Sequence, residues 1–165
     1  MNFEDYYNTF FTRVYNYARY RSSGPQEAED LTSCIFEKLY QRFEEYNPQK
    51  ATLEVWTFML AGSAAADYFR RKKIHRFFSL STEQEAEIPS GETAAGALEQ
   101  AEAEQQLHRA LLKLTDKERE IVNLHFYQRL KQREIAAVTG MTQSNVGVIL
   151  HRSAKKLKQF LGNGI

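Results

Sequence analysis

The segment between Arg133 and Leu161 reads as two helices joined by a tight turn, and this pattern constrains the chain more than any other feature. Gly140 stands where the first helix would end, because glycine adopts the left-handed backbone of a helix C-cap without strain. Thr142 suits the N-cap of a second helix that carries basic residues and no acid. A helix of this kind fits the DNA major groove, so the segment predicts a helix-turn-helix. The residues expected to face its core are Val146, Ile149, Leu150, Leu157 and Phe160.

Charge is distributed unevenly along the chain, although its net value is only +1. Residues 1–73 hold ten basic and ten acidic side chains, residues 74–106 hold one and seven, and residues 107–165 hold eleven and four. The positive charge gathers in the last helix and in the run Arg70–Lys73, where counterion release from phosphates would favour nucleic-acid binding.

Other bulk features point to a cytoplasmic protein that does not insert into a membrane. No stretch is long and apolar enough to span a bilayer, and the N-terminus lacks the basic start and apolar core of a signal peptide. The single cysteine, Cys34, excludes an internal disulfide and a thiolate zinc site.

Apolar residues recur at helical spacing over most of the chain, and no long stretch alternates with period two. Pro25 suits the first turn of a helix that reaches about Glu45, and Thr52 suits the N-cap of another that ends at Lys73. Thr115 and Glu118 form the pattern of a capping box.

The predicted fold is all-α, with two small helical domains joined by a flexible acidic linker. The first domain is expected over residues 1–76 and the second over residues 98–165. Residues 77–97 have few large apolar side chains and many glutamates, which is typical of a linker.

Two separated segments resemble a known family. The run Ala28–Tyr40, followed by the helix that ends in Asp67-Tyr-Phe-Arg-Arg71, looks like conserved domain 2 of bacterial sigma factors. Leu111–Val122 and the helix-turn-helix look like their domain 4. With no room for an intervening domain, the layout resembles the extracytoplasmic-function class. The resemblance implies an RNA polymerase sigma factor that binds core polymerase and directs promoter-specific initiation.

By this resemblance, the helix from Pro25 to Glu45 would dock on the clamp helices of the polymerase β′ subunit. We expect a hydrophobic strip beside acids that pair with basic residues of the partner, with Phe36 exposed. The expected polymerase-binding residues are Glu29, Asp30, Leu31, Ile35 and Phe36.

The segment from Tyr46 to Asp67 resembles the part that opens and reads the −10 element. Melting needs a pocket for an extruded base and aromatic faces that replace lost stacking. Trp56 could supply such a face, although a lone tryptophan on an apolar stripe is as often a core residue. The residues expected at the −10 element are Asn47, Gln49, Lys50, Trp56, Asp67, Arg70, Arg71, Lys72 and Lys73.

The last helix would lie in the −35 major groove while another surface of domain 4 meets the polymerase β flap. Residues at the N-terminus of that helix would reach base edges, and Arg152 and Lys155 would contact phosphates. The expected contacts are Thr142, Gln143, Ser144, Asn145, Val148, His151, Arg152 and Lys155. The chain departs from the family pattern at Gly147 and Gly62-Ser63, and Gly147 would allow close approach to DNA.

Two other classes of function fit the residues less well. A DNA-binding regulator that does not engage polymerase would need neither the acidic helix nor the loop before Trp56. An enzyme has little support, because the histidines lack ligand spacing and no glycine loop is present to hold phosphate. We read His75, His108, His125 and His151 as surface or capping residues, and expect no metal, cofactor or small-molecule substrate.

The resemblance also implies an anti-sigma factor as a partner, because a permanently free sigma factor would compete for polymerase. Opposed charges on the linker and the last helix further predict that the two domains pack together in the free chain and hide both DNA surfaces.

Overall fold

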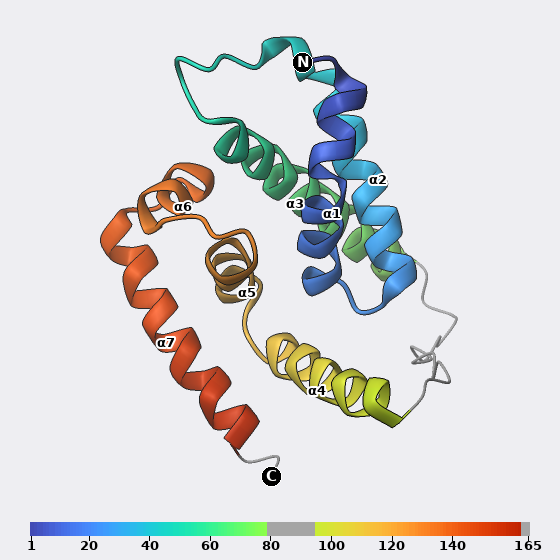
Figure 1. Ribbon diagram of the computed structural model, residues 1–165, viewed down its shortest axis with the longest axis vertical. Helices are drawn as coiled ribbons and strands as arrows, with labels where there is room; N and C mark the ends of the chain where they lie inside the picture. The colour runs from blue at the N-terminus through green and yellow to red at the C-terminus, as the bar shows by residue number, and fades with distance from the viewer. Residues whose placement is uncertain (79–94, 163–165) are drawn as a thin grey trace.

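The computed structural model describes residues 1–78 and 95–162, and within these ranges the chain is helical with no strand. Figure 1 shows the helices labelled in chain order. They are α1 (Phe3–Arg21), α2 (Pro25–Gln41), the short 3-10 helix η1 (Phe43–Glu45), α3 (Leu53–Phe78), α4 (Ala95–Leu112), α5 (Asp116–Val122), the π-helix η2 (Asn123–Tyr127), α6 (Gln132–Thr139) and α7 (Gln143–Gly162).

The helix boundaries follow local signals in the sequence. Pro25 opens α2, and the Thr52 hydroxyl accepts from the Val55 N–H at 3.3 Å to cap α3. Thr115 and Glu118 form the predicted capping box, with side chain to backbone distances of 3.2 and 3.0 Å. These contacts satisfy N–H groups that have no partner inside the helix.

The predicted linker is shorter than expected at both ends. Helix α3 continues to Phe78 and α4 begins at Ala95, so residues 77, 78 and 95–97 are helical. Residues 79–94, which form most of the predicted linker, lie outside the described residues. The division into domains at 76 and 98 stays a prediction.

The N-terminal half packs α1 and α2 side by side and lays α3 across them (Figure 1). Its core is unusually aromatic, because α1 repeats large rings at helical spacing. Tyr6, Tyr17 and Phe58 have no exposed surface. The Tyr6 hydroxyl lies 2.7 Å from Thr57 Oγ1, so burial of the ring leaves its polar end paired.

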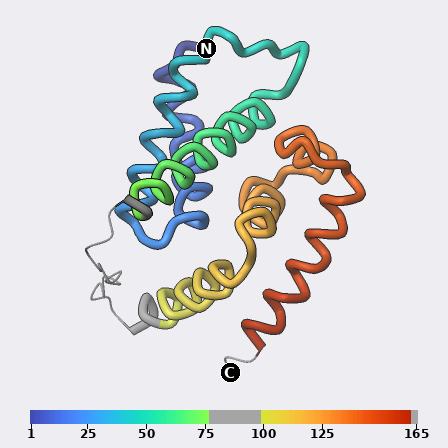
Figure 2. Tube along the Cα trace, turned by 180° about the vertical axis from the view of Figure 1, so that it is seen from behind, coloured from blue at the N-terminus to red at the C-terminus, as the bar shows by residue number. Residues whose placement is uncertain are grey.

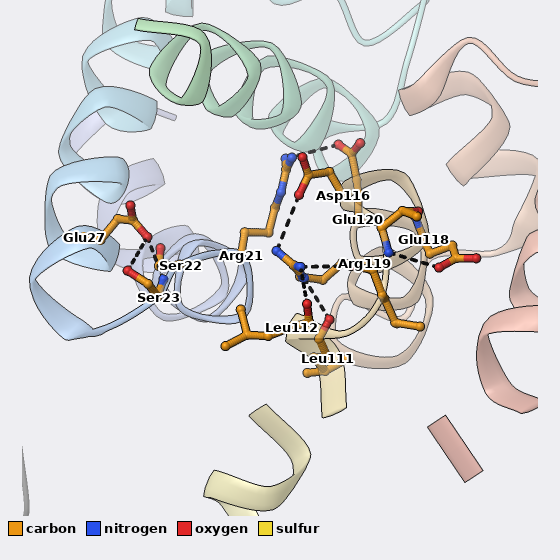
Figure 3. Close-up of polar contacts among 12 residues, drawn as sticks. Arg21, Ser22, Ser23, Glu27, Leu111, Leu112, Asp116, Glu118, Arg119 and Glu120 are labelled. Atoms are coloured by element: carbon orange, nitrogen blue, oxygen red, sulfur yellow. Dashed lines mark hydrogen bonds and ion pairs between the residues drawn. The ribbon is translucent and has the colours of Figure 1, made fainter. Parts of the chain in front are cut away.

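The C-terminal half consists of α4 to α7. The tube view from behind shows α7 running back past α5 toward α4 (Figure 2). Leu111, Leu114 and Val122 are buried between these helices. Arg119 donates to the carbonyl oxygens of Leu111, Leu112 and Leu114 at 2.9–3.2 Å, which satisfies the C-terminal end of α4 (Figure 3).

The two halves pack together, as the sequence predicted. One continuous set of buried side chains joins Phe58 of α3 to Ile121, Leu124 and Ile135 of the C-terminal half. The expected cause, attraction between linker and last helix, involves undescribed residues. The prediction that packing hides the DNA surface of the last helix is wrong, because the contact is made by α1 and α3 with α4, α5, η2 and α6 and leaves the basic face of α7 exposed.

Side chains of each half also form hydrogen bonds with backbone carbonyl groups of the other half. Arg13 Nη2 donates to the Gln128 carbonyl oxygen at 2.9 Å, and Gln128 Nε2 donates to the Arg13 carbonyl oxygen at 3.2 Å. Asn123 Nδ2 donates to the Tyr17 carbonyl oxygen at 2.9 Å, in a buried position. The two halves therefore meet in one defined orientation, because buried polar groups tolerate few alternatives.

His108 lies between the halves, which corrects the prediction that it is a surface or capping residue. Its Nε2 accepts from Arg19 Nη1 at 2.9 Å and lies 3.0 Å from the Ser22 carbonyl oxygen. Burial, helped by the charges of Arg19 and Arg119, lowers the pKa of His108 below its usual 6.5. The packed state therefore favours the neutral imidazole.

Acidification is expected to loosen the contact at His108. The pKa of His108 is lower in the packed state than in the separated state, so neutral His108 stabilises packing. This stabilisation is complete above pH 6.5 and is lost as the pH falls below that value. X-ray scattering should show a larger radius of gyration at about pH 5.5 than at about pH 7.5, and His108→Gln should flatten this change. If the radius of gyration of His108→Gln changed with pH as that of the original chain does, another group would cause the expansion.

Candidate nucleic-acid interface

The turn between α6 and α7 has the geometry that the sequence predicted. Gly140 has a φ of 73°, and its N–H donates to the Ala136 carbonyl oxygen at 2.9 Å to end α6. Thr142 Oγ1 accepts from the Asn145 N–H at 3.1 Å and begins α7. The left-handed residue and the cap fix the angle between the two helices.

Helix α7 buries one face and exposes the other. Val146, Leu150 and Ser153 are buried against the rest of the C-terminal half. Every residue expected at the −35 element is exposed. The set is Thr142, Gln143, Ser144, Asn145, Val148, His151, Arg152 and Lys155.

Gly147 does not face outward as expected. A Cβ at this position would lie 3.1 Å from Gln132 Oε1, at the start of α6. That contact is with the end of the exposed Gln132 side chain, and the expectation that Gly147 allows close approach to DNA stays a prediction.

Charge on α7 is positive near the exposed face. Arg152 and Lys155 are exposed, whereas the Lys156 ammonium donates to Glu118 at 2.6 Å. The Lys156 hydrogen bond lowers the pKa of the Glu118 carboxyl. Arg152 and Lys155 therefore remain available to a polyanion, while Lys156 joins α7 to α5.

The loop before α3 forms a structured, exposed turn. Asn47 Oδ1 accepts from the Gln49 N–H at 2.9 Å, and the Lys50 N–H donates to the Asn47 carbonyl oxygen at 3.0 Å. Asn47, Gln49 and Lys50 are all exposed. An asparagine side chain that accepts from the backbone two residues later in this way stabilises a turn.

Trp56 packs against Tyr46, the residue that precedes this loop, and is 7% exposed. Its ring centroid is 5.4 Å from that of Tyr46, 6.2 Å from Tyr6 and 6.4 Å from Phe43. The structure therefore places Trp56 as a core residue that supports the loop.

The basic end of α3 combines paired and exposed charges. Asp67 accepts from Lys38 at 3.0 Å and from Arg70 at 2.7 Å, and the hydrogen bond and charge of Lys38 lower the pKa of its carboxyl. Lys72 pairs with Glu27 of α2. Arg70, Arg71 and Lys73 are exposed, so this end of α3 presents a positive surface.

The expected polymerase-binding residues on α2 comprise exposed acids and buried apolar side chains. Glu29 and Asp30 are exposed, whereas Leu31 and Ile35 have no exposed surface. The expectation that Phe36 is exposed is wrong, because only 7% of it is accessible. Rings of Tyr7 and Phe11 from α1 cover it, with centroids 4.5 and 6.1 Å from the Phe36 ring.

An apolar groove of about 690 Å³, which the sequence did not predict, lies between α4, η2 and α7. Apolar residues recur at helical spacing on α4 and α7, but this spacing does not distinguish a groove from a buried core. Phe126, at its edge, is 56% exposed. The groove is lined by Leu107, Leu111, Val122, Phe126, Tyr127, Ala154, Leu157, Lys158, Leu161 and Gly162.

Within residues 1–78 and 95–162, no three side chains of the kind that bind metals cluster together. Over the same ranges, no helix has the length and apolar character needed to cross a membrane.

Comparison with known proteins identifies both halves. The Sigma-70 region 2 family matches residues 6–74, and the Sigma-70, region 4 family matches residues 104–157. The chain is 24% identical to RNA polymerase sigma factor YlaC of Bacillus subtilis over 156 residues, covering 94% of this chain and 90% of the relative. It is 23% identical to ECF RNA polymerase sigma factor SigM of the same organism, covering 100% and 98%.

Solved structures share the fold. The sigma factor RpoE, solved in complex with the anti-sigma factor NepR from Bartonella quintana, superposes with a TM-score of 0.75 at 18% identity, covering 97% of this chain and 96% of that one. CnrH, solved in complex with the cytosolic domain of CnrY, gives a TM-score of 0.68 at 19% identity, covering 98% and 88%.

The two family matches lie in the order predicted from the sequence and together include most of the chain. The relatives are similar over nearly their whole length and are transcription initiation factors. The chain belongs to the extracytoplasmic-function class of the sigma-70 family, and it is an RNA polymerase sigma factor that directs transcription initiation.

Proposed function

We propose that the two halves divide promoter recognition between them, with residues 1–76 binding core polymerase and opening the −10 element and residues 98–165 reading the −35 element. The observation that carries this proposal is the exposed face of α7. All eight residues assigned to it are exposed, and both the left-handed glycine and the threonine cap that orient the helix are in place.

At the −35 element, Gln143, Ser144 and Asn145 reach base edges from the first turn of α7. The amide and hydroxyl groups of these side chains suit hydrogen bonding in the major groove, and the positive end of the helix dipole favours nearby phosphate. Arg152 and Lys155, two to three turns later, neutralise phosphates and fix the position of the helix.

At the −10 element, the exposed turn of Asn47, Gln49 and Lys50 contacts the opened strand. Trp56 supports this turn by packing against Tyr46, so its contribution is to hold the loop rather than to offer a free ring. Arg70, Arg71 and Lys73 contact the flanking phosphates. Asp67 and Lys72 act through ion pairs that hold α3 against α2.

Core polymerase binds α2 through Glu29 and Asp30, which are exposed acids near the positive end of that helix. Their partners are basic groups of the β′ clamp helices. Leu31, Ile35 and Phe36 contribute by packing α2 in the core, since they have little or no accessible surface.

The groove between α4, η2 and α7 suits an apolar segment of a protein partner, because its walls are leucine, valine and aromatic side chains. We assign it to the polymerase β flap. An anti-sigma factor is a second partner, by analogy with the relatives solved as complexes with NepR and with the cytosolic domain of CnrY.

Charge reversal on α2 tests the assignment of the polymerase surface. Glu29→Lys with Asp30→Lys is expected to weaken binding to core polymerase by roughly ten-fold or more, because like charges then face the clamp. DNA binding by the same chain should not fall. The measurement is a titration of labelled chain with core polymerase, beside a DNA titration.

The matched control is Glu44→Lys with Glu45→Lys, which reverses two exposed acids beyond the end of α2. If both double variants weakened polymerase binding equally, only net charge would matter and the assignment to Glu29 and Asp30 would fail.

A further inference from the structure

Gly147 leaves a gap in a row of polar side chains along α7. Residues four positions apart are neighbours on a helix, so Gln143, Gly147 and His151 follow one another along it. Gln143 and His151 are exposed and belong to the set assigned to the −35 element. Because glycine has no side chain, α7 itself offers only backbone between these two residues.

The side chain of Gln132, at the start of α6, lies at this gap. A Cβ at Gly147 would lie 3.1 Å from Gln132 Oε1, 3.7 Å from its Cδ and 3.8 Å from its Nε2. The whole amide is therefore close to the point where a side chain at position 147 would begin. Gln132 is exposed and Gly147 is half-buried. Helix α6 thus supplies, beside Gly147, a polar group that α7 lacks there.

The backbone that carries Gln132 is held on both sides. Leu130 is 3% exposed, and its N–H donates to a carbonyl oxygen of η2 at 3.0 Å. The Lys131 N–H donates to Glu134 Oε2 at 2.7 Å, which satisfies an N–H at the start of α6. Ile135, one turn after Gln132, is buried in the core. These contacts give Gln132 a defined starting position, which a side chain that reads a base requires.

The exposed side chains that flank Gln132 are cations, namely Arg129, Lys131 and Arg133. Cations bind phosphates through charge, and contacts with phosphate carry no direct sequence information. A glutamine amide instead presents both a donor and an acceptor, and in the major groove this pair matches N6 and N7 of adenine. The cations therefore suit phosphates, and Gln132 suits a base edge.

We propose that Gln132 reads a base pair of the −35 element across the gap that Gly147 leaves in α7, and that adenine is the base it prefers. Both helices of the helix-turn-helix then read sequence, with Gln132 as a specificity-determining residue outside α7. DNA that approaches Gly147 meets the Gln132 amide at the same place. This inference rests on the proposed function, because it requires α7 to lie in the −35 major groove.

The test uses the full chain bound to core polymerase, on a promoter that the original chain recognises and whose −35 element has been randomised. DNA recovered from the polymerase complexes is sequenced, which gives the preference at each base pair. Gln132→Ala should reduce the preference for adenine at one base pair by roughly five-fold to 100-fold. The preferences at the other base pairs should stay as they are.

Gly147→Ala is a second change at the same place. Its methyl group would force the Gln132 amide to shift, while alanine favours a helix interior more than glycine does. This variant should therefore weaken the preference at the same base pair without loss of folded protein. Gln132→Ala combined with Gly147→Ala should lose no more preference than Gln132→Ala alone, because both changes act on one interaction.

Two matched controls separate reading of a base from other effects. Arg133→Ala, next to Gln132 in α6, should lower binding to all sequences and leave the preferences unchanged. Gln159→Ala removes an exposed glutamine near the other end of α7 and should alter neither binding nor preference. Circular dichroism verifies the helix content of each chain before the selection.

Unchanged preferences in Gln132→Ala would overturn the proposal, and so would a lost preference for a base other than adenine. Losses at different base pairs in Gln132→Ala and Gly147→Ala, or losses that add in the double variant, would show that the two residues act separately and would also overturn it. If the original chain formed no polymerase complex or showed no preference at any −35 base pair, the proposed function would fail, and this inference with it.

Discussion

Trp56→Ala is expected to lower the free energy of unfolding of the N-terminal half by about 3–5 kcal/mol, the range for removing a large buried aromatic side chain. The ring is 7% exposed and meets Tyr6, Phe43 and Tyr46, so its loss leaves a cavity in the aromatic core. Urea denaturation followed by circular dichroism measures the change. The loop of Asn47, Gln49 and Lys50 should lose its support at the same time.

Trp56→Phe separates support of the core from direct contact with a base. If Trp56 acts by packing, the phenylalanine variant should recover much of the stability and most of the promoter opening, measured with a fluorescent base at the −10 element. A stable Trp56→Phe chain that no longer opens DNA would show that the indole touches the extruded base. A loss below about 1 kcal/mol in Trp56→Ala would contradict the burial of the ring.

Arg152→Ala combined with Lys155→Ala is expected to lower DNA affinity by roughly 10- to 100-fold for all sequences. Removing two phosphate contacts should also reduce the slope of log affinity against log salt by about 1.8. Gln143→Ala should instead change which −35 sequence is preferred, because its side chain lies where base edges are reached. Fluorescence anisotropy over a salt series, with several −35 sequences, measures both effects.

The matched control is Lys156→Ala, because Lys156 lies on the same helix but pairs with Glu118. Lys156→Ala should lower DNA affinity less than Arg152→Ala or Lys155→Ala does. If Arg152→Ala with Lys155→Ala altered sequence choice and left general affinity and the salt slope unchanged, the face of α7 assigned to DNA would be wrong.

Local features of the fold could be predicted from the sequence because their causes lie within a few residues. Gly140, Thr142 and Thr115 mark helix ends through backbone conformation and caps, which depend on neighbours three or four positions away. The exposed face of α7 followed from helical spacing alone. The all-α fold followed for the same reason, whereas the order of the two family regions followed from the resemblance to sigma factors.

Features that depend on partners distant in the chain could not be predicted. The spacing along α2 places Phe36 beside exposed acids, and nothing in that spacing shows that Tyr7 and Phe11 cover it. His108 has no sequence neighbour that marks it as an interface residue, because its partners, Arg19 and Ser22, lie in the other half.

The surroundings of Gly62 could not be predicted from the sequence either. Within α3 it is a destabilising choice for a helix interior. Its role becomes clear only when Glu120, which is far away in sequence, is placed against it. This contact joins the two halves, and helical periodicity does not reveal it.

The most direct test of the central claim is transcription by purified core polymerase, with and without this chain, from a library of genomic promoter fragments. A chain that works as proposed forms a stable complex with core polymerase. Its transcripts begin downstream of a shared motif with one part near −35 and another near −10. Binding of DNA by the chain alone, with no complex and no chain-dependent transcript, would contradict the assignment and leave a DNA-binding protein that does not engage polymerase.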